Sequence, residues 1–245
     1  NDFLITGSGA DTVLGGTGAD EVYANAGNDS ILGDAGNDAL YGGDGQDTIS
    51  GGNENDYIQG DAGNDSLTGD SGDDFLRGDA GNDTVSGGTG NDSVYGGADN
   101  DLVYGGDGND EVYGGFGTDT VYGGIGNDSV TGSGGNDIVF GDDGDDRVQG
   151  SDGNDTPYGG AGNDILLGEE DADVLYGGIG DYVDGGESVT TGTDNDTLHV
   201  SGVRSVSFDV TNQENGVVTF LDGSTLNFYN IENLFVDGEQ YLPPD

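Results

Sequence analysis

The chain has 245 residues, of which 31% are apolar, and 50 Asp and Glu residues face only 3 Lys and Arg, for a net charge of −47. Globular domains usually contain about 45–50% apolar residues, so an ordinary core is not expected, and a chain of this charge should stay expanded unless a cation compensates it. The charge excludes nucleic acids as partners and disfavours an anionic membrane, the absence of cysteine excludes disulfides and thiolate metal sites, and no apolar stretch approaches the roughly 20 residues of a membrane span.

From residue 1 to 180 a nine-residue unit repeats without insertion or deletion. With Gly105 as position 1, the 19 complete units of residues 6–176 have Asp at position 6 in every case. Position 1 is Gly in 17 of these units, position 4 is Gly in 16, and position 8 is Val, Ile or Leu in 18. A phase held this long indicates that the repeat is the architecture. Because residues 1–5 already lie in frame and the chain does not begin with Met, we expect further sequence before Asn1.

A few units depart from the pattern, and we expect their coils to be the weakest. The departures are acidic residues at the position-4 glycine and one proline at the apolar position 8: Glu54, Asp99, Asp171 and Pro157. A proline cannot donate a hydrogen bond to a neighbouring strand.

The nine positions predict a turn followed by a short strand. Positions 1 to 6 concentrate Gly, Asn and Asp, which tolerate the positive φ of tight turns. Positions 7 to 9 predict a three-residue strand whose middle side chain faces inward. Two successive units then make one coil, with a thin core formed by a ladder of aliphatic side chains. Aspartates of successive units fall on opposite edges, and those of every second unit stack on the same edge.

The stacked aspartates predict calcium sites. Neighbouring coils lie about 4.8 Å apart, so the carboxylates would repel one another unless a divalent cation lay between each adjacent pair. Oxygen ligands favour Ca²⁺ over Mg²⁺, which prefers to keep its waters, and over Zn²⁺, which prefers His or Cys. Counting gaps along the two edges gives nine and eight, so about 17 Ca²⁺ would neutralise 34 of the 47 net negative charges, and their binding would drive folding. The predicted ligands are Asp11, Asp20, Asp29, Asp38, Asp47, Asp56, Asp65, Asp74, Asp83, Asp92, Asp101, Asp110, Asp119, Asp128, Asp137, Asp146, Asp155, Asp164 and Asp173.

The unit G-G-x-G-x-D-x-U-x, in which U is a large aliphatic residue, resembles the RTX (repeats-in-toxin) calcium-binding nonapeptide over about three-quarters of the chain. The resemblance implies an all-β fold, a right-handed parallel β-roll with two nonapeptides per coil. It also implies that turn carbonyls join the aspartates as ligands. Such carbonyls belong to Gly105, Gly106, Asp107, Gly108, Gly123, Gly124, Ile125 and Gly126. Members of this family are typically bacterial proteins that pass unfolded through type I secretion machinery and fold in external calcium.

After Gly180 the sequence changes character. One residue is missing from the frame at Asp181, and a loop rich in Gly, Ser and Thr leads to a degenerate last unit at 193–198. We therefore divide the chain into a roll at 1–183, a loop with the degenerate repeat at 184–198, and a β-rich C-terminal cap at 199–245. Asp222-Gly223 predicts a hairpin inside the cap. The expected core of the cap is formed by Phe208, Phe220, Phe228 and Phe235.

An aromatic row stands out at position 9. Its members, one from every second unit, are Tyr104, Tyr122, Phe140, Tyr158 and Tyr176. We favour a structural ladder between strands, partly covered by the cap, over the alternative of a docking or glycan-stacking face. The one histidine, His199, is interpreted as an isolated strand or surface residue, and the arginines as local partners of aspartates.

We find no catalytic constellation, because the paired carboxylates lie in no apolar pocket suited to acid–base chemistry. The sequence predicts calcium binding that drives folding in a secreted, extracellular or cell-surface bacterial protein, as a structural or adhesive segment of a larger chain. The alternative is the C-terminal secretion and folding module of a secreted protease, lipase or epimerase.

Overall fold

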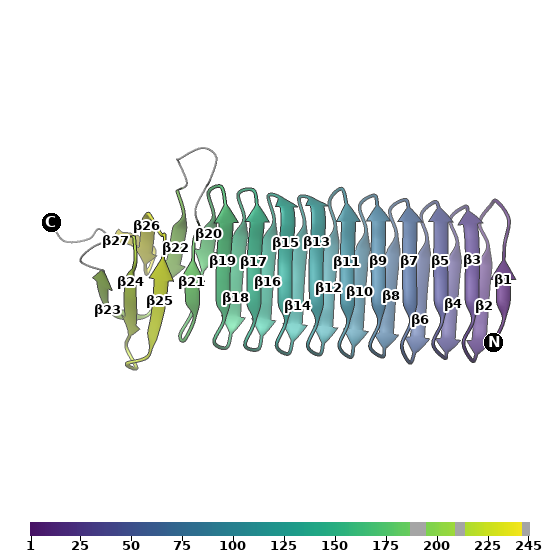
Figure 1. Ribbon diagram of the computed structural model, residues 1–245, viewed down its shortest axis with the longest axis horizontal. Helices are drawn as coiled ribbons and strands as arrows, with labels where there is room; N and C mark the ends of the chain where they lie inside the picture. Colours follow the sequence, from purple (N-terminus) through teal and green to yellow (C-terminus); the bar gives the residue numbers. More distant parts are fainter. Residues whose placement is uncertain (187–194, 209–213, 242–245) are drawn as a thin grey trace.

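The computed structural model describes residues 1–186, 195–208 and 214–241, with the side chains of Arg204 and Phe208 left out. Strands run side by side along one long axis, with the N-terminus at one end and the cap at the other (Figure 1). The described residues contain strands and turns but no helix, and hence none that could cross a membrane. Coils that stack in parallel confirm the predicted β-solenoid.

The chain alternates between two sheets that lie face to face, so that each coil gives one strand to each. The first sheet follows the order β1-β3-β5-β7-β9-β11-β13-β15-β17-β19-β21-β25-β24-β23. Its strands are β1 (Phe3–Ile5), β3 (Glu21–Ala26), β5 (Ala39–Asp44), β7 (Tyr57–Ala62), β9 (Phe75–Ala80), β11 (Ser93–Ala98), β13 (Glu111–Gly117), β15 (Ser129–Gly135), β17 (Arg147–Asp152), β19 (Ile165–Glu170), β21 (Tyr182–Asp184), β23 (Val203–Phe208), β24 (Gly216–Phe220) and β25 (Thr225–Tyr229).

The second sheet follows the order β2-β4-β6-β8-β10-β12-β14-β16-β18-β20-β22-β26-β27. Its strands are β2 (Thr12–Thr17), β4 (Ser30–Ala35), β6 (Thr48–Asn53), β8 (Ser66–Ser71), β10 (Thr84–Thr89), β12 (Leu102–Asp107), β14 (Thr120–Ile125), β16 (Ile138–Asp143), β18 (Thr156–Ala161), β20 (Val174–Tyr176), β22 (Thr197–Val200), β26 (Asn233–Val236) and β27 (Glu239–Tyr241).

Neighbouring coils pair with a register of two repeat units, as the period predicts. Val103 of β12 pairs with Val121 of β14, and Tyr104 pairs with Tyr122. The strands are longer than the three residues expected, because most cover positions 7 to 9 and then positions 1 to 3 of the next unit. Pairing skips position 1 and resumes at position 2, where Gly106 lies opposite Gly124. At position 1 a Cβ on Gly105 would lie 2.5 Å from the carbonyl oxygen of Gly123 in the next coil, so glycine allows the two backbones to approach there.

Position 8 forms the core of the roll. Its side chains are buried in both sheets and make one continuous apolar cluster. Fully buried examples are Leu40, Ile58 and Val112. Pro157 is also buried and lies opposite Val139 in the register, so the roll accommodates it at a core position.

The acidic residues that replace the position-4 glycine keep a positive φ, but a smaller one than the 149° of Gly63 and the 154° of Gly108 at the same position. Glu54, Asp99 and Asp171 have φ of 71°, 77° and 75°, in the left-handed region that side chains other than glycine rarely adopt. A positive φ at a residue other than glycine strains these turns locally. The same φ occurs at Asp34, Asp61 and Asp70 in regular coils, so the expectation that these coils are the weakest remains a prediction.

The C-terminal cap extends both sheets before it closes them. β25 pairs in parallel with β21, and β26 pairs in parallel with β22. The predicted hairpin at Asp222-Gly223 is confirmed, because β24 and β25 pair antiparallel on either side of it. Residues 187–194 of the predicted loop lie outside the described residues.

The core of the cap differs in part from the expected set. Phe220 and Phe228 are buried together with Val218 and Leu226. Phe235 is only half-buried, because it faces outward on β26 rather than into the cap. The expected role of the Phe208 side chain lies outside the description.

Candidate calcium sites

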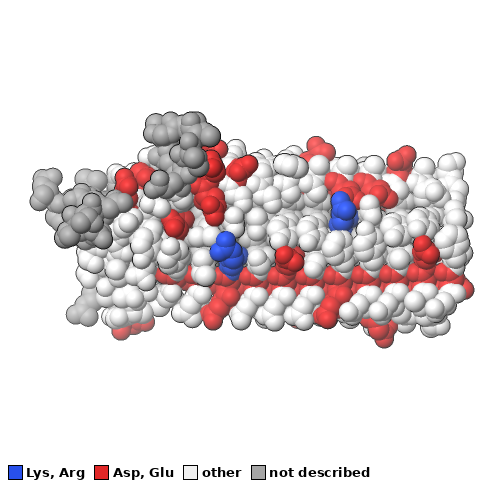
Figure 2. All heavy atoms as spheres, in the orientation of Figure 1, with Lys and Arg blue, Asp and Glu red and all other residues white. Residues whose placement is uncertain are grey.

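The position-6 aspartates lie just before each strand, in two rows, one along each edge of the roll. Every member from Asp20 to Asp164 is at most 4% exposed, and Asp11, in the first coil, is half-buried. Figure 2 shows a continuous line of acidic side chains along the roll. The predicted aspartates are therefore gathered in stacks whose neighbours come from every second unit.

One oxygen of each carboxylate helps to join the coils. Oδ1 of Asp110 accepts the backbone N–H of Asp92 at 2.8 Å, and the backbone N–H of Asp110 donates to Oδ1 of Asp128 at 2.8 Å. The same arrangement recurs along both rows with a spacing of 18 residues. Each aspartate is thus fixed in one orientation by its neighbour.

The second oxygen is buried without a hydrogen-bond partner. This holds for Oδ2 of all the aspartates taken in steps of nine from Asp20 to Asp164. A buried carboxylate oxygen without a partner costs free energy, and a whole row of them costs it many times over.

The glycine at position 1 makes space for this oxygen. A Cβ on Gly105 would lie 2.6 Å from Oδ2 of Asp110 and 2.5 Å from the carbonyl oxygen of Gly123 in the next coil. Two oxygens thus converge where a side chain is missing, with no donor between them. Oxygen-only sites of this kind suit a hard cation such as Ca²⁺.

The pKa values of the row are raised, because burial disfavours the ionised form of each carboxylate. Burial raises the pKa of Asp155 from 3.8 to about 7, against the backbone N–H of Asp137, which lowers it. Burial likewise raises the pKa of Asp65 and Asp92 to about 7, and that of Asp83 and Asp137 to about 6. A divalent cation beside these groups would favour the ionised form and reverse the shift.

No basic side chain among the described residues neutralises the rows. Arg77 is paired with Asp79 on a sheet face, and Arg147 donates to Gln149. The ammonium of Asn1 lies 3.4 Å from Oδ1 of Asp20, at the first coil only. The described residues also contain no cluster of three or more His, Cys, Asp or Glu side chains around one point. A cation here would therefore be held by two carboxylates and backbone carbonyls.

Comparison with protein families identifies the family to which the chain belongs. The model of the RTX calcium-binding nonapeptide repeat matches in overlapping copies from residue 1 to residue 184. The chain belongs to this RTX family. Comparison with curated proteins found no match. The family gives the roll a calcium-binding, structural role, and the buried row of carboxylates is the part of this RTX chain that would bind the ions.

The carbonyls expected to complete the RTX sites lie in adjacent coils of one edge, in β12, β14 and the turns that follow them. The carbonyl of Asp107 accepts the N–H of Gly90 at 2.8 Å, and that of Ile125 accepts the N–H of Gly108 at 2.7 Å. Each carbonyl oxygen has a second lone pair that a cation could use. The carbonyl oxygen of Gly123 and Oδ2 of Asp110 both lie close to the place that a Cβ on Gly105 would take, as described above. The ligand roles of these carbonyls remain a prediction.

A row of hydrogen bonds between the backbone N–H groups and side chains of position-5 residues was not predicted from the sequence. The backbone N–H of Asn109 donates to Oδ1 of Asn91 at 2.9 Å, and that of Asn127 donates to Oδ1 of Asn109 at 2.8 Å. The ladder runs at the exposed tip of the turn, beside the buried row. The signal was present in the frequent Asn at position 5, which we interpreted only as a turn preference.

The aromatic row at position 9 is a stack, but it is longer than expected. Rings from Tyr104 to Tyr176 stack with centroids 4.4–5.0 Å apart. His199 continues the stack at 4.8 Å from Tyr176, and Phe235 follows at 4.9 Å. His199 lies on strand β22, in agreement with the interpretation as a strand residue, but it is not isolated, because its ring stacks on two aromatic neighbours. The cap strand β26 extends this row rather than covering it, because it adds to the edge of the same sheet.

A second aromatic row, not foreseen, runs along the opposite sheet in the N-terminal half. Its members are Phe3, Tyr23, Tyr41, Tyr57, Phe75, Tyr95 and Tyr113. Phe3, Tyr57 and Phe75 occupy position 7 and the other members position 9. Both positions point outward, so no single position of the repeat reveals the row.

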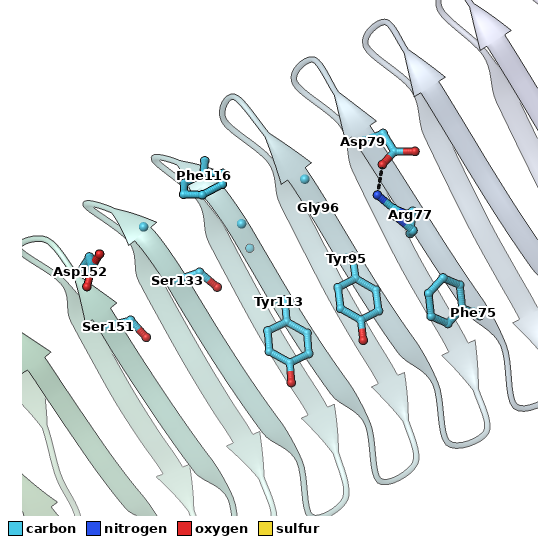
Figure 3. Close-up of a pocket in the computed structure, with 14 residues that line it drawn as sticks. Phe75, Arg77, Asp79, Tyr95, Gly96, Tyr113, Phe116, Ser133, Ser151 and Asp152 are labelled. Carbon is cyan, nitrogen blue, oxygen red and sulfur yellow. Dashed lines mark hydrogen bonds and ion pairs between the residues drawn. The ribbon is translucent and has the colours of Figure 1, made fainter.

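The second row borders an open groove of about 590 Å³ at its C-terminal end (Figure 3). Tyr95 and Tyr113 line one side, the floor is bare glycine backbone, and the exposed Phe116 lies on the loop side. The ion pair between Arg77 and Asp79 lies near one end.

Proposed function

We propose that this chain binds about 17 Ca²⁺ ions that drive its folding and stabilise it outside the cell. The observation that carries the proposal is the double row of buried carboxylates whose second oxygens have no hydrogen-bond partner from Asp20 to Asp164. Each ion would lie between two coils, so that stacked aspartates from every second unit share it. The attraction of both carboxylates to one divalent charge then replaces their mutual repulsion.

The residues that would hold an ion can be named for one edge. Asp110 and Asp128 supply carboxylates, and the turns that precede them, 105–108 and 123–126, supply carbonyls. What calcium contributes is positive charge and a demand for about 6–8 oxygen ligands. The chain contributes carboxylates whose orientation is already fixed, because the N–H groups of Asp92 and Asp110 donate to the carboxylates of Asp110 and Asp128.

The setting we propose is a structural or adhesive segment of a larger bacterial protein that leaves the cell by type I secretion. A chain with net charge −47 would remain unfolded where calcium is scarce, which suits export through a channel. Calcium at about 10⁻⁴–10⁻³ M, as extracellular modules require, would then fold it after export. A C-terminal module of a secreted enzyme would use the same physics.

The adhesive part of the proposal rests on the two outward-facing aromatic rows. Their half-buried rings give a continuous surface on which a glycan or a protein could stack. If a variant carrying Tyr104→Ala and Tyr122→Ala folds in calcium and retains full attachment, the first row has no adhesive role.

The test of calcium-driven folding is a titration of the purified chain followed by circular dichroism. In chelator we expect disorder, and on addition of calcium a steep rise of β structure, because each ion needs two neighbouring coils. Magnesium at equal concentration should fold the chain far less. Full β structure in chelator, unchanged by calcium, would overturn the proposal.

A matched pair of variants locates the effect. Asp110→Asn removes a charge from the buried row, whereas Glu111→Gln removes one from the next residue, an exposed side chain on the outer face of β13. Asp110→Asn should raise the calcium midpoint and lower the ion stoichiometry, and Glu111→Gln should change neither measurably.

A further inference from the structure

The open groove on the outer face of the first sheet forms where position 2 of the repeat loses its side chain. At this position Asp79 of β9 lies opposite Gly97 of β11, which lies opposite Gly115 of β13. Gly115 in turn lies opposite Ser133 of β15, and Ser151 of β17 follows. The two glycines leave bare backbone in the middle of the groove, and polar side chains remain at both of its ends.

Aromatic rings stand on the two long sides of this floor. Tyr95 and Tyr113 stack on each other on one side, with centroids 5.0 Å apart and planes inclined by 6°. Phe116, which is 77% exposed, lies on the other side (Figure 3). Its Cδ1 is 3.2 Å from the place that a Cβ on Gly134 would take, so a glycine of the neighbouring strand gives the Phe116 ring its space.

The aromatic row ends inside the groove, at Tyr113. The next residue in register at position 9 is Thr131 of β15, which has no ring. One face of Tyr113 is therefore covered by Tyr95, and no position-9 ring covers the other face. The Tyr113 hydroxyl donates to Oε1 of Glu111 at 2.6 Å, which holds the ring in place. A fixed aromatic face beside polar groups suits a ligand that has one apolar side.

The ends of the groove supply hydrogen-bonding groups of little net charge. Arg77 is paired with Asp79 at one end, and a guanidinium group has further N–H donors that a ligand could use. Ser133 and Ser151 bring hydroxyls to the other end, together with the carboxylate of Asp152. The groove thus offers donors and acceptors rather than a strong charge of either sign.

These features fit a neutral saccharide better than other ligands. A sugar ring has an apolar C–H face, which suits an aromatic ring, and a rim of hydroxyls, which suits Ser, Asp and Arg side chains. The net charge of −47 disfavours anionic saccharides. An extended peptide could not add a strand here, because the backbones of Gly97 and Gly115 already pair within the sheet.

We propose that this groove binds a neutral oligosaccharide, with one sugar ring against the free face of Tyr113 and beside Phe116. Sugar hydroxyls would bond to the polar groups at the two ends. The proposal rests on the adhesive part of the proposed function and gives it a ligand class and a place. The groove crosses the strands from β9 to β17 of one sheet, and four strand spacings of ~4.8 Å make about 19 Å, which suits several linked sugars.

The experiment measures binding to the calcium-saturated chain by isothermal titration calorimetry. The probes are maltohexaose, cellohexaose, chitohexaose and mannohexaose, with a heparin-derived hexasaccharide as the anionic probe. We expect at least one neutral probe to bind and the heparin fragment not to bind. Phe116→Ala should lower the affinity on the order of tenfold, because one ring contact is lost. Its matched control is Ile125→Ala, which removes a side chain 58% exposed at the same position of β14, on the opposite sheet, and should bind as the parent chain does.

A second pair of variants tests the other side of the groove. Tyr113→Ala should lower the affinity by a similar factor, whereas Tyr122→Ala removes the same ring from the same position of β14 and should leave the affinity unchanged. Should Tyr113→Ala fail to fold, Phe116→Ala decides, because the exposed Phe116 ring can be removed without opening the core.

Circular dichroism of the same samples separates the outcomes. If calcium leaves the dichroism of a folded parent chain unchanged, calcium-driven folding fails, and the binding data still test the groove. If the chain folds in calcium but binds no neutral probe, or binds the heparin fragment more tightly, the saccharide proposal alone is overturned. Equal affinities of Phe116→Ala and Ile125→Ala would also overturn it. If Phe116→Ala lowers the sedimentation coefficient of the calcium-saturated chain, the groove holds a second copy instead of a saccharide. A chain that stays unfolded at every calcium concentration overturns both proposals.

Discussion

The roll and the cap use the same strand pairing but bury different groups. Each half-coil of the roll buries one aliphatic side chain at position 8 and one carboxylate at position 6. The cap buries a compact apolar set that includes Val218, Phe220, Leu226 and Phe228. The cap thus resembles an ordinary hydrophobic core, whereas the roll carries a charged row that apolar burial alone does not offset.

The two regions also differ in how they end. Within the roll every coil pairs only with the coil before it and the coil after it, so the last coil would leave two open sheet edges. The cap covers one edge with the antiparallel strands β24 and β23, and the other with β27. The comparison indicates two different means of stabilisation: the proposed ions would hold the coils together, and apolar packing closes the stack.

The largest effect that would test this difference is the pH response without calcium. Burial raises the pKa of Asp56 and Asp101 to about 7 in the folded chain, above the ordinary 3.8 of an unfolded chain. The folded roll then binds more protons than the unfolded chain between about pH 4 and 7, so its stability rises as pH falls through that range. In chelator, the β signal in circular dichroism should increase on acidification from pH 8 to 5.

Calcium should invert this dependence. Protons compete with the ion for the carboxylates, so the calcium midpoint should rise as the pH falls. A chelated chain that stays disordered on acidification would show that the buried carboxylates are not what opposes folding of the roll.

A substitution in the cap is expected to have the next largest effect. Phe228 is fully buried, and Phe228→Ala should cost about 3–5 kcal/mol by removing apolar contacts and leaving a cavity. We expect urea unfolding in saturating calcium to show loss of the cap before loss of the roll. The NMR signal of His199, which stacks on Phe235 of the cap, follows the cap, and circular dichroism follows the roll. Leu40→Ala, fully buried near the other end, should cost about 2–5 kcal/mol and leave the His199 signal in place. If both variants lose the two signals together, the roll and the cap form one cooperative unit.

The smallest effect probes the glycine that makes space in the roll. Gly105 does not have positive φ, so Gly105→Ala tests space alone, and the new Cβ would crowd Oδ2 of Asp110 and the carbonyl of Gly123. Overpacking of this kind costs about 1–3 kcal/mol, and the calcium midpoint should rise with it. Gly7→Ala is the matched control, because a Cβ on Gly7 meets nothing within 4 Å. Equal midpoints for the two variants would mean that the oxygens beside Gly105 do not form an ion site.

The sequence by itself determined the coil, the two edges and the aliphatic ladder. Each of these depends on a spacing of one or two repeat units, and within the repeats the neighbour of any residue is fixed by that spacing. Asp110 therefore had to stack between Asp92 and Asp128, and Val103 between Val85 and Val121.

Only the tertiary structure decided what happens where the spacing fails. Asp181, Asp196 and Glu232 join the rows across 17, 23 and 36 residues, and no period predicts such partners. His199 meets Phe235 because β26 pairs beside β22, a choice made by strands of the cap rather than by the repeat. Periodicity can specify a neighbour only while the chain advances by equal steps; beyond that, strand pairing and packing select it.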